Sequence, residues 1–302
     1  MLENFSREDS HVERILGAVG NTPLFPLRTT SLFAKAEFLN PTGSVKDRAA
    51  AGMIRRALEE EKLRSSRTEI LDSSSGNTGI SLAAFGASLG LRVSIVLPES
   101  ASQERQKLLR MYGACIIFSD PMEGSDGAIQ VAREIVAREP EKYCYTDQYS
   151  NDANWQAHYQ GTAEEIWEQT AGRITHFVAG VGTGGTVMGT GRKLKELNPD
   201  IRIVAVEPDQ AFHGIEGLKH IASSIKPRIF DEKFPDETVL VKTEEAQKEV
   251  LRLAREEGLF VGTSSGASSI AARKYLSPEN VVVAIFADQG NRYLSEKYLE
   301  KK

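Results

Sequence analysis

The chain has 302 residues, of which 40% are hydrophobic and 26% charged, and its formal net charge is −5 at pH 7. This composition is that of a globular protein with a large core, and the length favours two domains over one. Because there is no basic block, no long apolar stretch and no apolar leader, we expect no nucleic-acid partner, no membrane contact and a cytoplasmic location.

Short runs rich in β-branched residues alternate with helical patterns along most of the chain, and these runs predict strands. In chain order they are residues 33–38, 68–72, 92–98, 115–119, 142–147, 175–180, 201–207, 258–262 and 281–287. The runs lack polar alternation, which is typical of parallel sheets that helices cover on both faces. The sequence therefore predicts an α/β fold with two doubly wound domains and mostly parallel sheets.

Helix-start signals precede several of the intervening segments. Ser102 and Ser125 stand where an N-cap would begin a helix, and Thr162 with Glu165 has the spacing of a capping box. The least regular segment covers residues 208–236. A long irregular stretch inside an α/β domain is more often functional than idle, which predicts a functional role for this one.

The two cysteines, Cys115 and Cys144, both fall on predicted strands. In a reducing compartment we expect each to be a small, buried apolar residue rather than half of a disulfide. No cluster of cysteine and histidine has the spacing of metal ligands, so we expect no metal.

The first of three glycine-rich turns joins a strand that ends at Asp72 to a helix that begins near Thr78. Its backbone N–H groups, two hydroxyls and an amide at a helix N-terminus suit a small anion such as a carboxylate. A tight turn closed by an Asn or Ser cap explains the same residues equally well. The residues of this turn are Ser74, Ser75, Gly76, Asn77 and Thr78.

The second turn lies between a predicted strand and a predicted helix, and Gly180, Gly182 and Gly185 satisfy G-x-G-x-x-G. With Glu207 ending the next strand, the spacing fits a dinucleotide fingerprint. A cup of N–H groups around one phosphate fits as well, and the motif alone does not decide. The residues of that cup are Gly182, Thr183, Gly184, Gly185 and Thr186. A third turn, "GTSSGAS" at residues 262–268, is explained equally well as a capped helix.

Lys46 decides between these ligands. It lies in "NPTGSVKDR", in the first turn of a predicted helix, where a cation is disfavoured by the helix dipole. A cofactor that forms an imine needs a lysine whose amine can become neutral, and both the helix end and Arg48 lower its pKa. A nicotinamide enzyme needs no such lysine. One lysine, one phosphate cup and one carboxylate turn together indicate a pyridoxal phosphate site.

With these motifs in order, from "GNTPL" at residues 20–24 to "NRYLS" at 291–295, the chain resembles the cysteine synthase family. The resemblance is to the B-type branch of that family, which belongs to the fold type II pyridoxal phosphate enzymes, with a fold like that of tryptophan synthase β. It implies a smaller, mobile domain at residues 38–146 that binds the substrate carboxylate. It also implies a larger domain, residues 1–37 and 147–302, that binds the cofactor phosphate.

The resemblance also implies roles for individual residues. Lys46 would form the Schiff base with the cofactor and later transfer the proton as the base. Asn77 would bond the phenolic oxygen of the cofactor, Ser264 its pyridine nitrogen, and residues 182–186 its phosphate. The positions that match contacts to the substrate carboxylate are Ser74, Ser75, Thr78 and Gln148.

The implied reaction is a β-replacement on an O-activated L-serine through an α-aminoacrylate, in which a sulfur nucleophile gives L-cysteine. The segment "FADQGNRY" is similar to the B-type branch, and "THFVAGVGTGGTVMGTGR" is similar to the members of that branch that accept O-phosphoserine, so the resemblance implies O-phosphoserine or O-acetylserine as the donor. In such members a basic residue after "VAVEP" contacts the substrate phosphate, and Lys219 is the best match, although a solvated surface lysine is the alternative. The family further implies a homodimer and leaves a sulfur-carrier protein open as sulfur source.

Other functions remain open at this stage. Cystathionine β-synthase and diaminopropionate synthases perform related β-replacements with other nucleophiles. An NAD-dependent oxidoreductase would use only the glycine motif and Glu207. A silent binding protein that keeps the fold is opposed by the intact Lys46.

Overall fold

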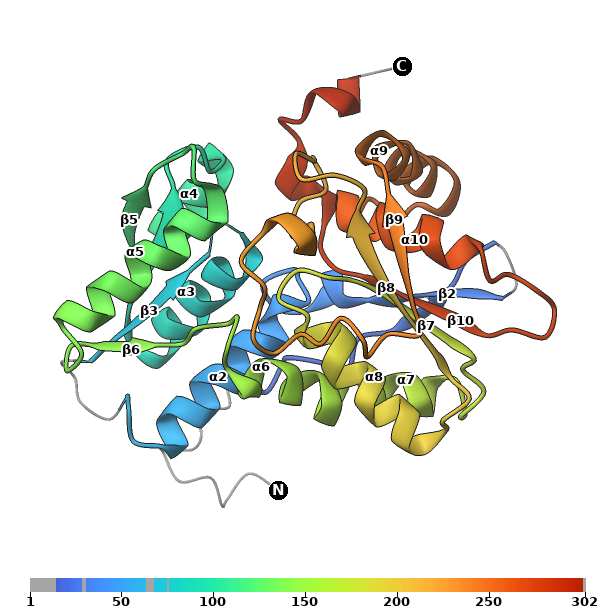
Figure 1. The fold of residues 1–302 in the computed structure, drawn as a ribbon, viewed down its shortest axis with the longest axis horizontal. Coiled ribbons are helices and arrows are strands. Elements are labelled where there is room, and N and C mark those ends of the chain that lie inside the picture. The colour runs from blue at the N-terminus through green and yellow to red at the C-terminus, as the bar shows by residue number, and fades with distance from the viewer. Residues whose placement is uncertain (1–14, 29–30, 64–67, 75, 301–302) are drawn as a thin grey trace. The chain divides into compact units, whose positions relative to one another are not determined.

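The computed structural model describes residues 15–28, 31–63, 68–74 and 76–300, and its ribbon is drawn in Figure 1. The chain separates into two compact units. The first unit comprises the described residues of Met1–Val19, Asn40–Thr42 and Lys46–Ala153, and the second comprises those of Gly20–Leu39, Gly43–Val45 and Asn154–Lys302. Residues 15–19 and 147–153 thus belong to the first unit, whose predicted counterpart was 38–146.

The first unit contains a four-stranded sheet in the order β5-β4-β3-β6, with all neighbours parallel. Its strands are β3 (Glu69–Ser73), β4 (Arg92–Pro98), β5 (Cys115–Ser119) and β6 (Tyr143–Tyr145). Its helices are α2 (Lys46–Glu59), α3 (Asn77–Leu89), α4 (Gln103–Met111) and α5 (Gly124–Arg138).

Consecutive residues of β3 bury their side chains on opposite faces of this sheet, as strand geometry requires. Ile70 packs in one core cluster with Ile54 of α2 and Phe85 of α3. Leu71 packs in another with Val96 of β4 and with α5. Helices therefore cover both faces, and the first unit is doubly wound as predicted.

The second unit contains a six-stranded sheet in the order β1-β2-β10-β7-β8-β9, in which only the β1–β2 pair is antiparallel. Its strands are β1 (Leu24–Pro26), β2 (Leu32–Ala36), β7 (His176–Gly180), β8 (Arg202–Pro208), β9 (Glu237–Val241) and β10 (Val282–Phe286). A continuous helical stretch covers one face, formed by α6 (Asp152–Ala157), the π-helical segment η2 (His158–Thr162) and α7 (Ala163–Gln169). Helix α8 (Gly185–Leu197) lies on the same face of the sheet. Residues of α7 and α8 pack in one core cluster with Phe177 and Ile203.

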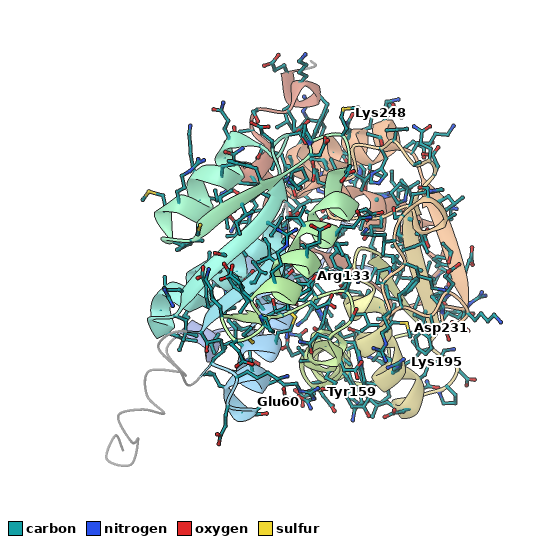
Figure 2. The ribbon with its side chains drawn as sticks, turned by 60° about the vertical axis from the view of Figure 1, so that its left-hand side comes forward. Glu60, Arg133, Tyr159, Lys195, Asp231 and Lys248 are labelled. Atoms are coloured by element: carbon teal, nitrogen blue, oxygen red, sulfur yellow. The ribbon has the colours of Figure 1, made fainter. Side chains whose placement is uncertain are left out.

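The opposite face of the six-stranded sheet is covered by α10 (Thr263–Arg273), against which α9 (Thr243–Arg252) packs. The π-helical segment η4 (Leu253–Glu257) extends α9. The remaining short 3₁₀ helices are η1 (Glu37–Leu39), η3 (Ile221–Ser223), η5 (Gly290–Tyr293) and η6 (Lys297–Glu300). Exposed charged side chains such as Glu60, Asp231 and Lys248 project from the outside of the ribbon in Figure 2.

Most predicted strands lie within about two residues of the observed ones, but the predicted strand at 258–262 is wrong. There Val261 makes only an isolated bridge to Gln289, because Gly258 leaves η4 in a left-handed conformation with φ of 71° and the chain reaches α10 within five residues. The prediction missed β1, which contains a proline, and β9, which forms an edge of its sheet.

The helix-start predictions were partly correct. The Ser102 side chain accepts the Arg105 N–H as predicted, whereas α5 begins at Gly124, so Ser125 is not its N-cap. The capping box is also wrong, because Thr162 lies inside a continuous helix and its hydroxyl is 2.9 Å from Nδ1 of His158.

Glu165, the other member of the supposed capping box, binds a buried lysine instead. Lys35 has no exposed surface, and its Nζ donates to Glu165 Oε2 at 2.6 Å and to Gln169 Oε1 at 2.9 Å. It also donates to the Thr22 carbonyl at 2.6 Å, and the Thr22 hydroxyl donates to Glu37 at 2.7 Å. The "GNTPL" motif is thus held to β2 and α7 by a buried polar network.

The two cysteines differ in their surroundings. Cys144 on β6 is buried, as expected. The expectation for Cys115 was wrong, because β5 is an edge strand and its first residue is exposed. Across the described part of the chain, no helix combines the length and apolar character that crossing a membrane requires.

Candidate active site

Lys46 is the first residue of α2 and is half-buried, which confirms its predicted place at a helix start. The residue before it, Val45, belongs to the second unit, where its N–H donates to the Ala287 carbonyl at 2.8 Å. The Ala287 N–H in turn donates to Ser265 Oγ at 2.9 Å, in the first turn of α10. The chain immediately before Lys46 is therefore tied to the helix start that carries Ser264.

The predicted carboxylate turn lies between β3, which ends at Ser73, and α3, which begins at Asn77. The Ser74 hydroxyl accepts the N–H of Gly79 at 3.0 Å, so it satisfies one of the N–H groups that a helix start leaves without a partner. Asn77 is half-buried and Thr78 is buried. Ser75 lies outside the described residues.

Gln148 is brought against this turn from 70 residues away. Its Oε1 accepts the Thr78 hydroxyl at 2.7 Å, and its Nε2 donates to the Ser73 carbonyl at 2.9 Å. The same Nε2 lies 3.3 Å from Oδ1 of Asp72, a fully buried carboxyl whose pKa burial raises to about 7. The structure thus gathers Ser74, Thr78 and Gln148 in one buried polar group.

Asp47 completes the arrangement around Lys46, and the sequence analysis did not single it out. The carboxylate is fully buried and accepts the Thr42 N–H at 2.6 Å, the Thr42 hydroxyl, and the Ser81 hydroxyl at 2.5 Å. The Ser81 oxygen lies 3.0 Å from the Asn77 carbonyl oxygen. The sequence shows an acid directly after the lysine in "VKDR", which could have drawn attention to Asp47. That Asp47 bonds Ser81 of α3 is visible only in the folded structure.

The second turn, for which a phosphate cup is one prediction, joins β7 to α8. β7 ends at Gly180, α8 begins at Gly185, and Gly184 between them has φ of +85°. A side chain at Gly182 would place its Cβ 2.3 Å from the Gly217 carbonyl oxygen, and one at Gly184 would meet Phe230 at 2.6 Å. Only glycine permits so close an approach of the backbone. The N–H groups at the start of α8 therefore lie at this turn.

The two threonines of the cup are held by side chains from α6 and η2. Asn154 Nδ2 donates to Thr183 Oγ1 at 3.0 Å, and His158 Nε2 lies 3.3 Å from Thr186 Oγ1. The sequence analysis missed Asn154 and His158, although their spacing of four, continued by Thr162, puts all three on one helix face. N–H groups and hydroxyls of this kind suit a phosphate dianion, so the residues fit a phosphorylated cofactor.

Ser264 is buried in the first turn of α10, as expected for a residue that meets a cofactor ring. The neighbouring Thr263 hydroxyl accepts the N–H of Glu216 at 3.1 Å. Glu216 belongs to the irregular segment 208–236, which also packs Leu218 against Gly180. That segment therefore contacts both the α8 start and the α10 start.

Lys219 lies in the same segment, and the alternative of a solvated surface lysine is wrong because its exposure is only 7%. Its N–H donates to the Val181 carbonyl at 2.8 Å, directly before the phosphate cup. Glu207, the acid of the dinucleotide motif, accepts the Ile221 N–H at 3.2 Å, and burial raises its pKa. A carboxyl engaged in this way is a poor ribose ligand, which argues against the dinucleotide reading.

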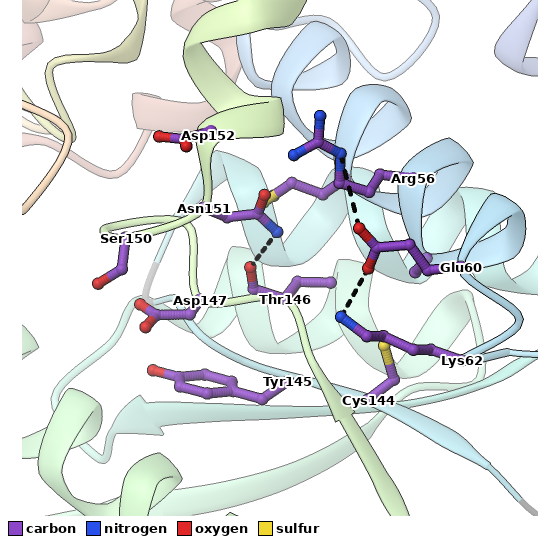
Figure 3. A pocket seen from close by; sticks show the side chains of 12 residues that line it. Arg56, Glu60, Lys62, Cys144, Tyr145, Thr146, Asp147, Ser150, Asn151 and Asp152 are labelled. Carbon is purple, nitrogen blue, oxygen red and sulfur yellow. Dashed lines mark hydrogen bonds and ion pairs between the residues drawn. The ribbon is translucent and has the colours of Figure 1, made fainter.

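A polar pocket of about 310 Å³ lies elsewhere in the first unit, between the second half of α2 and the β6–α6 connection (Figure 3). Glu60 lies between Arg56, at 4.0 Å, and Lys62, at 2.6 Å, on one side of it. None of the predicted site residues lines this pocket, so we assign it no part in the reaction.

Residues 15–288 match the family of pyridoxal-phosphate-dependent enzymes. A cysteine synthase of Aquifex aeolicus is 48% identical over 305 aligned positions, covering 96% of this chain and 93% of that protein. Cysteine synthase B of Pseudomonas aeruginosa is 41% identical, covering 93% of this chain and 95% of that protein.

Solved structures agree with these relatives. Cysteine synthase from Entamoeba histolytica superposes with a TM-score of 0.89 at 35% identity, covering 100% of this chain and 93% of that one. An O-acetylserine-dependent cystathionine β-synthase from Helicobacter pylori superposes with a TM-score of 0.87 at 36% identity, covering 94% and 97%.

The fold and the matched family define a fold type II enzyme that depends on pyridoxal phosphate. Within that class the chain belongs to the cysteine synthase family, and its reaction is pyridoxal-phosphate-dependent cysteine synthesis. This confirms the predicted fold, cofactor and enzyme class. It also excludes the NAD-dependent oxidoreductase and the silent binding protein.

Proposed function

We propose that Lys46 is the lysine that bears the cofactor and the base that moves the substrate proton. When bound, pyridoxal phosphate supplies an aldehyde that captures an amino group and a ring that draws electrons from the substrate Cα. Lys46 is suited to both tasks because the residue is half-buried at a positive helix end, where the neutral form of a lysine amine is favoured. The observation that carries the proposal is the fixed start of α2, tied on one side by Val45 and on the other by Asp47.

The cup of residues 182–186 would bind the cofactor phosphate, with the hydroxyls of Thr183 and Thr186 adding to the N–H groups of the α8 start. Ser264 would meet the ring nitrogen and Asn77 the phenolic oxygen. A neutral hydroxyl at the ring nitrogen leaves that nitrogen largely unprotonated, which suits loss of a β-substituent better than transamination.

The turn with Ser74, Ser75, Thr78 and Gln148 would bind the substrate carboxylate. Helix-start N–H groups and hydroxyls favour an anion at this position. We propose that the first unit is the smaller, mobile domain and that carboxylate binding closes it over the substrate, which would exclude water from the reacting atoms.

We propose O-acetylserine as the donor of the aminoacryl group, because two of the solved neighbours carry that donor in their names. A second candidate is O-phosphoserine, and the observation that favours it is the buried Lys219 beside the phosphate cup. A cation at that place would bind a dianionic leaving group better than a neutral acetyl ester. We further propose a cytoplasmic homodimer that takes its sulfur from sulfide or from a sulfur-carrier protein.

The visible spectrum tests these assignments. The purified protein should be yellow, and Lys46→Ala should lose both the absorbance of the lysine–cofactor bond and cysteine formation. Normal turnover in that variant would contradict the role of Lys46.

Parallel titrations with O-acetylserine and O-phosphoserine distinguish the two donors. If the Lys219 charge binds phosphate, Lys219→Met should raise the KM for O-phosphoserine alone by at least about tenfold.

A further inference from the structure

The carboxylate of Asp47 joins the start of α2 to the start of α3. Its Oδ1 accepts the Thr42 hydroxyl and the Ser81 hydroxyl, the latter at 2.5 Å, and its Oδ2 accepts the Thr42 N–H at 2.6 Å. Ser81 lies one turn after Asn77 and its oxygen is 3.0 Å from the Asn77 carbonyl. Lys46 and Asn77, which we assign to the cofactor, are thus connected through one carboxylate and one hydroxyl.

Helix capping alone does not explain this arrangement. An acid in the first turn of a helix offsets the positive helix end equally well when it faces water. Asp47 is instead fully buried, which is costly for a charge unless hydrogen bonds replace its hydration. The bond to Ser81 spans 34 residues and reaches a different helix. The buried carboxylate therefore links the starts of two helices.

We propose that Asp47 is a positioning residue that holds the Lys46 backbone in register with Asn77. This inference rests on the proposed function, because it assumes that Lys46 bears the cofactor. To bear the cofactor, the neutral lysine amine would attack the aldehyde carbon, and a C=N bond would replace the C=O bond as the two amine protons leave with the aldehyde oxygen as water. Since the rate of such a step depends on how well the reacting atoms are oriented, a loosened α2 start should slow it.

Ser81→Ala is the informative variant, because it removes the link to α3 and leaves both the carboxylate and the lysine in place. Ser94→Ala is its matched control: Ser94 is a buried hydroxyl in the same unit that donates to the carboxylate of Glu69. Each variant loses one buried serine–carboxylate bond, so the two should lose similar stability. Urea unfolding of both proteins without cofactor measures that loss.

The cofactor is then added back as pyridoxal 5′-phosphate, and formation of the lysine bond is followed by visible absorbance. Borohydride reduction with peptide mapping identifies the lysine. We expect Ser81→Ala to form the bond at Lys46 about tenfold more slowly than Ser94→Ala. Affinity for 4′-deoxypyridoxine 5′-phosphate, which has the ring and the phosphate but no aldehyde, should be equal in both variants.

Equal bond-formation rates in the two serine variants would overturn the positioning role. A parent protein labelled at a lysine other than Lys46 would instead overturn the proposed function. If Ser81→Ala does not fold, Thr42→Val provides a second test, because it removes the other hydroxyl bonded to Asp47, which also lies 3.2 Å from the Ser81 hydroxyl. It too should slow bond formation relative to Ser94→Ala, and a rate equal to that control would overturn the proposal.

Discussion

Replacing Asp72 by asparagine should change how the stability of the protein depends on pH. Asp72 is fully buried at the end of β3 and accepts the Thr146 hydroxyl and two N–H groups of Gln148. Burial, aided by the nearby charge of Asp147, raises its pKa to about 7, against the opposing effect of the Thr146 and Gln148 hydrogen bonds. Asparagine has nearly the same shape but cannot ionise.

The magnitude follows from the two pKa values. A carboxyl that titrates at 3.8 in the unfolded chain and at about 7 in the folded protein corresponds to about 4 kcal/mol. Because the folded state holds the proton more tightly, this stabilisation is complete below pH 3.8, declines as pH rises and is lost above about pH 7. Relative to the parent, Asp72→Asn should therefore gain up to about 4 kcal/mol between pH 4 and pH 8.

Urea unfolding followed by circular dichroism across that pH range measures the difference between variant and parent. The asparagine also exchanges an acceptor for a donor toward Gln148, which adds a cost in unfolding free energy of about 1–3 kcal/mol that does not depend on pH. The test is therefore how the difference in unfolding free energy changes with pH, not its absolute size. As a control, Thr146→Val removes a bond that lowers the Asp72 pKa and should extend the parent's decline to higher pH. Parallel curves for Asp72→Asn and the parent would refute the reasoning.

Two further changes test the second unit. Glu165→Gln leaves the buried Lys35 ammonium without its carboxylate partner, so we expect a loss of about 3–5 kcal/mol in urea unfolding; a loss below about 1 kcal/mol would mean that Thr22 and Gln169 suffice. Gly184→Ala forces a side chain into a positive-φ position 2.6 Å from Phe230, so cofactor affinity should fall at least about tenfold. Equilibrium dialysis with pyridoxal phosphate measures that affinity, and an unchanged value would show that the cup is not the phosphate site.

The parts of the site that could be predicted depend on local sequence. A glycine-rich turn between a strand and a helix exposes helix-start N–H groups wherever it occurs, so residues 74–78 and 182–186 indicated anion sites before any fold was known. Lys46 stood out because a cation at a helix start is unfavourable and needs a chemical reason.

What could not be predicted depends on side chains that meet across long stretches of chain. Thr162 has the spacing of an N-cap, but packing against α8 keeps the helix running through it, and its hydroxyl bonds His158. Lys219 is a charged residue in an irregular segment, and nothing in its neighbours along the chain indicated its burial. The burial of Cys115 was predicted wrongly because the residues of a strand do not indicate whether it lies at the edge of a sheet.

The sequence by itself determined the alternation of strands and helices, and it indicated the two turns that we propose to bind anions and the lysine that we propose to bear the cofactor. These rest on backbone geometry and on the helix dipole, which act within a few residues. Only the tertiary structure decided that Asp47 reaches Ser81, that Gln148 closes on Thr78 and that Glu165 binds Lys35. Each of these is a buried hydrogen bond whose partner is chosen when the chain excludes water, because a polar group without a partner would then be too costly to bury.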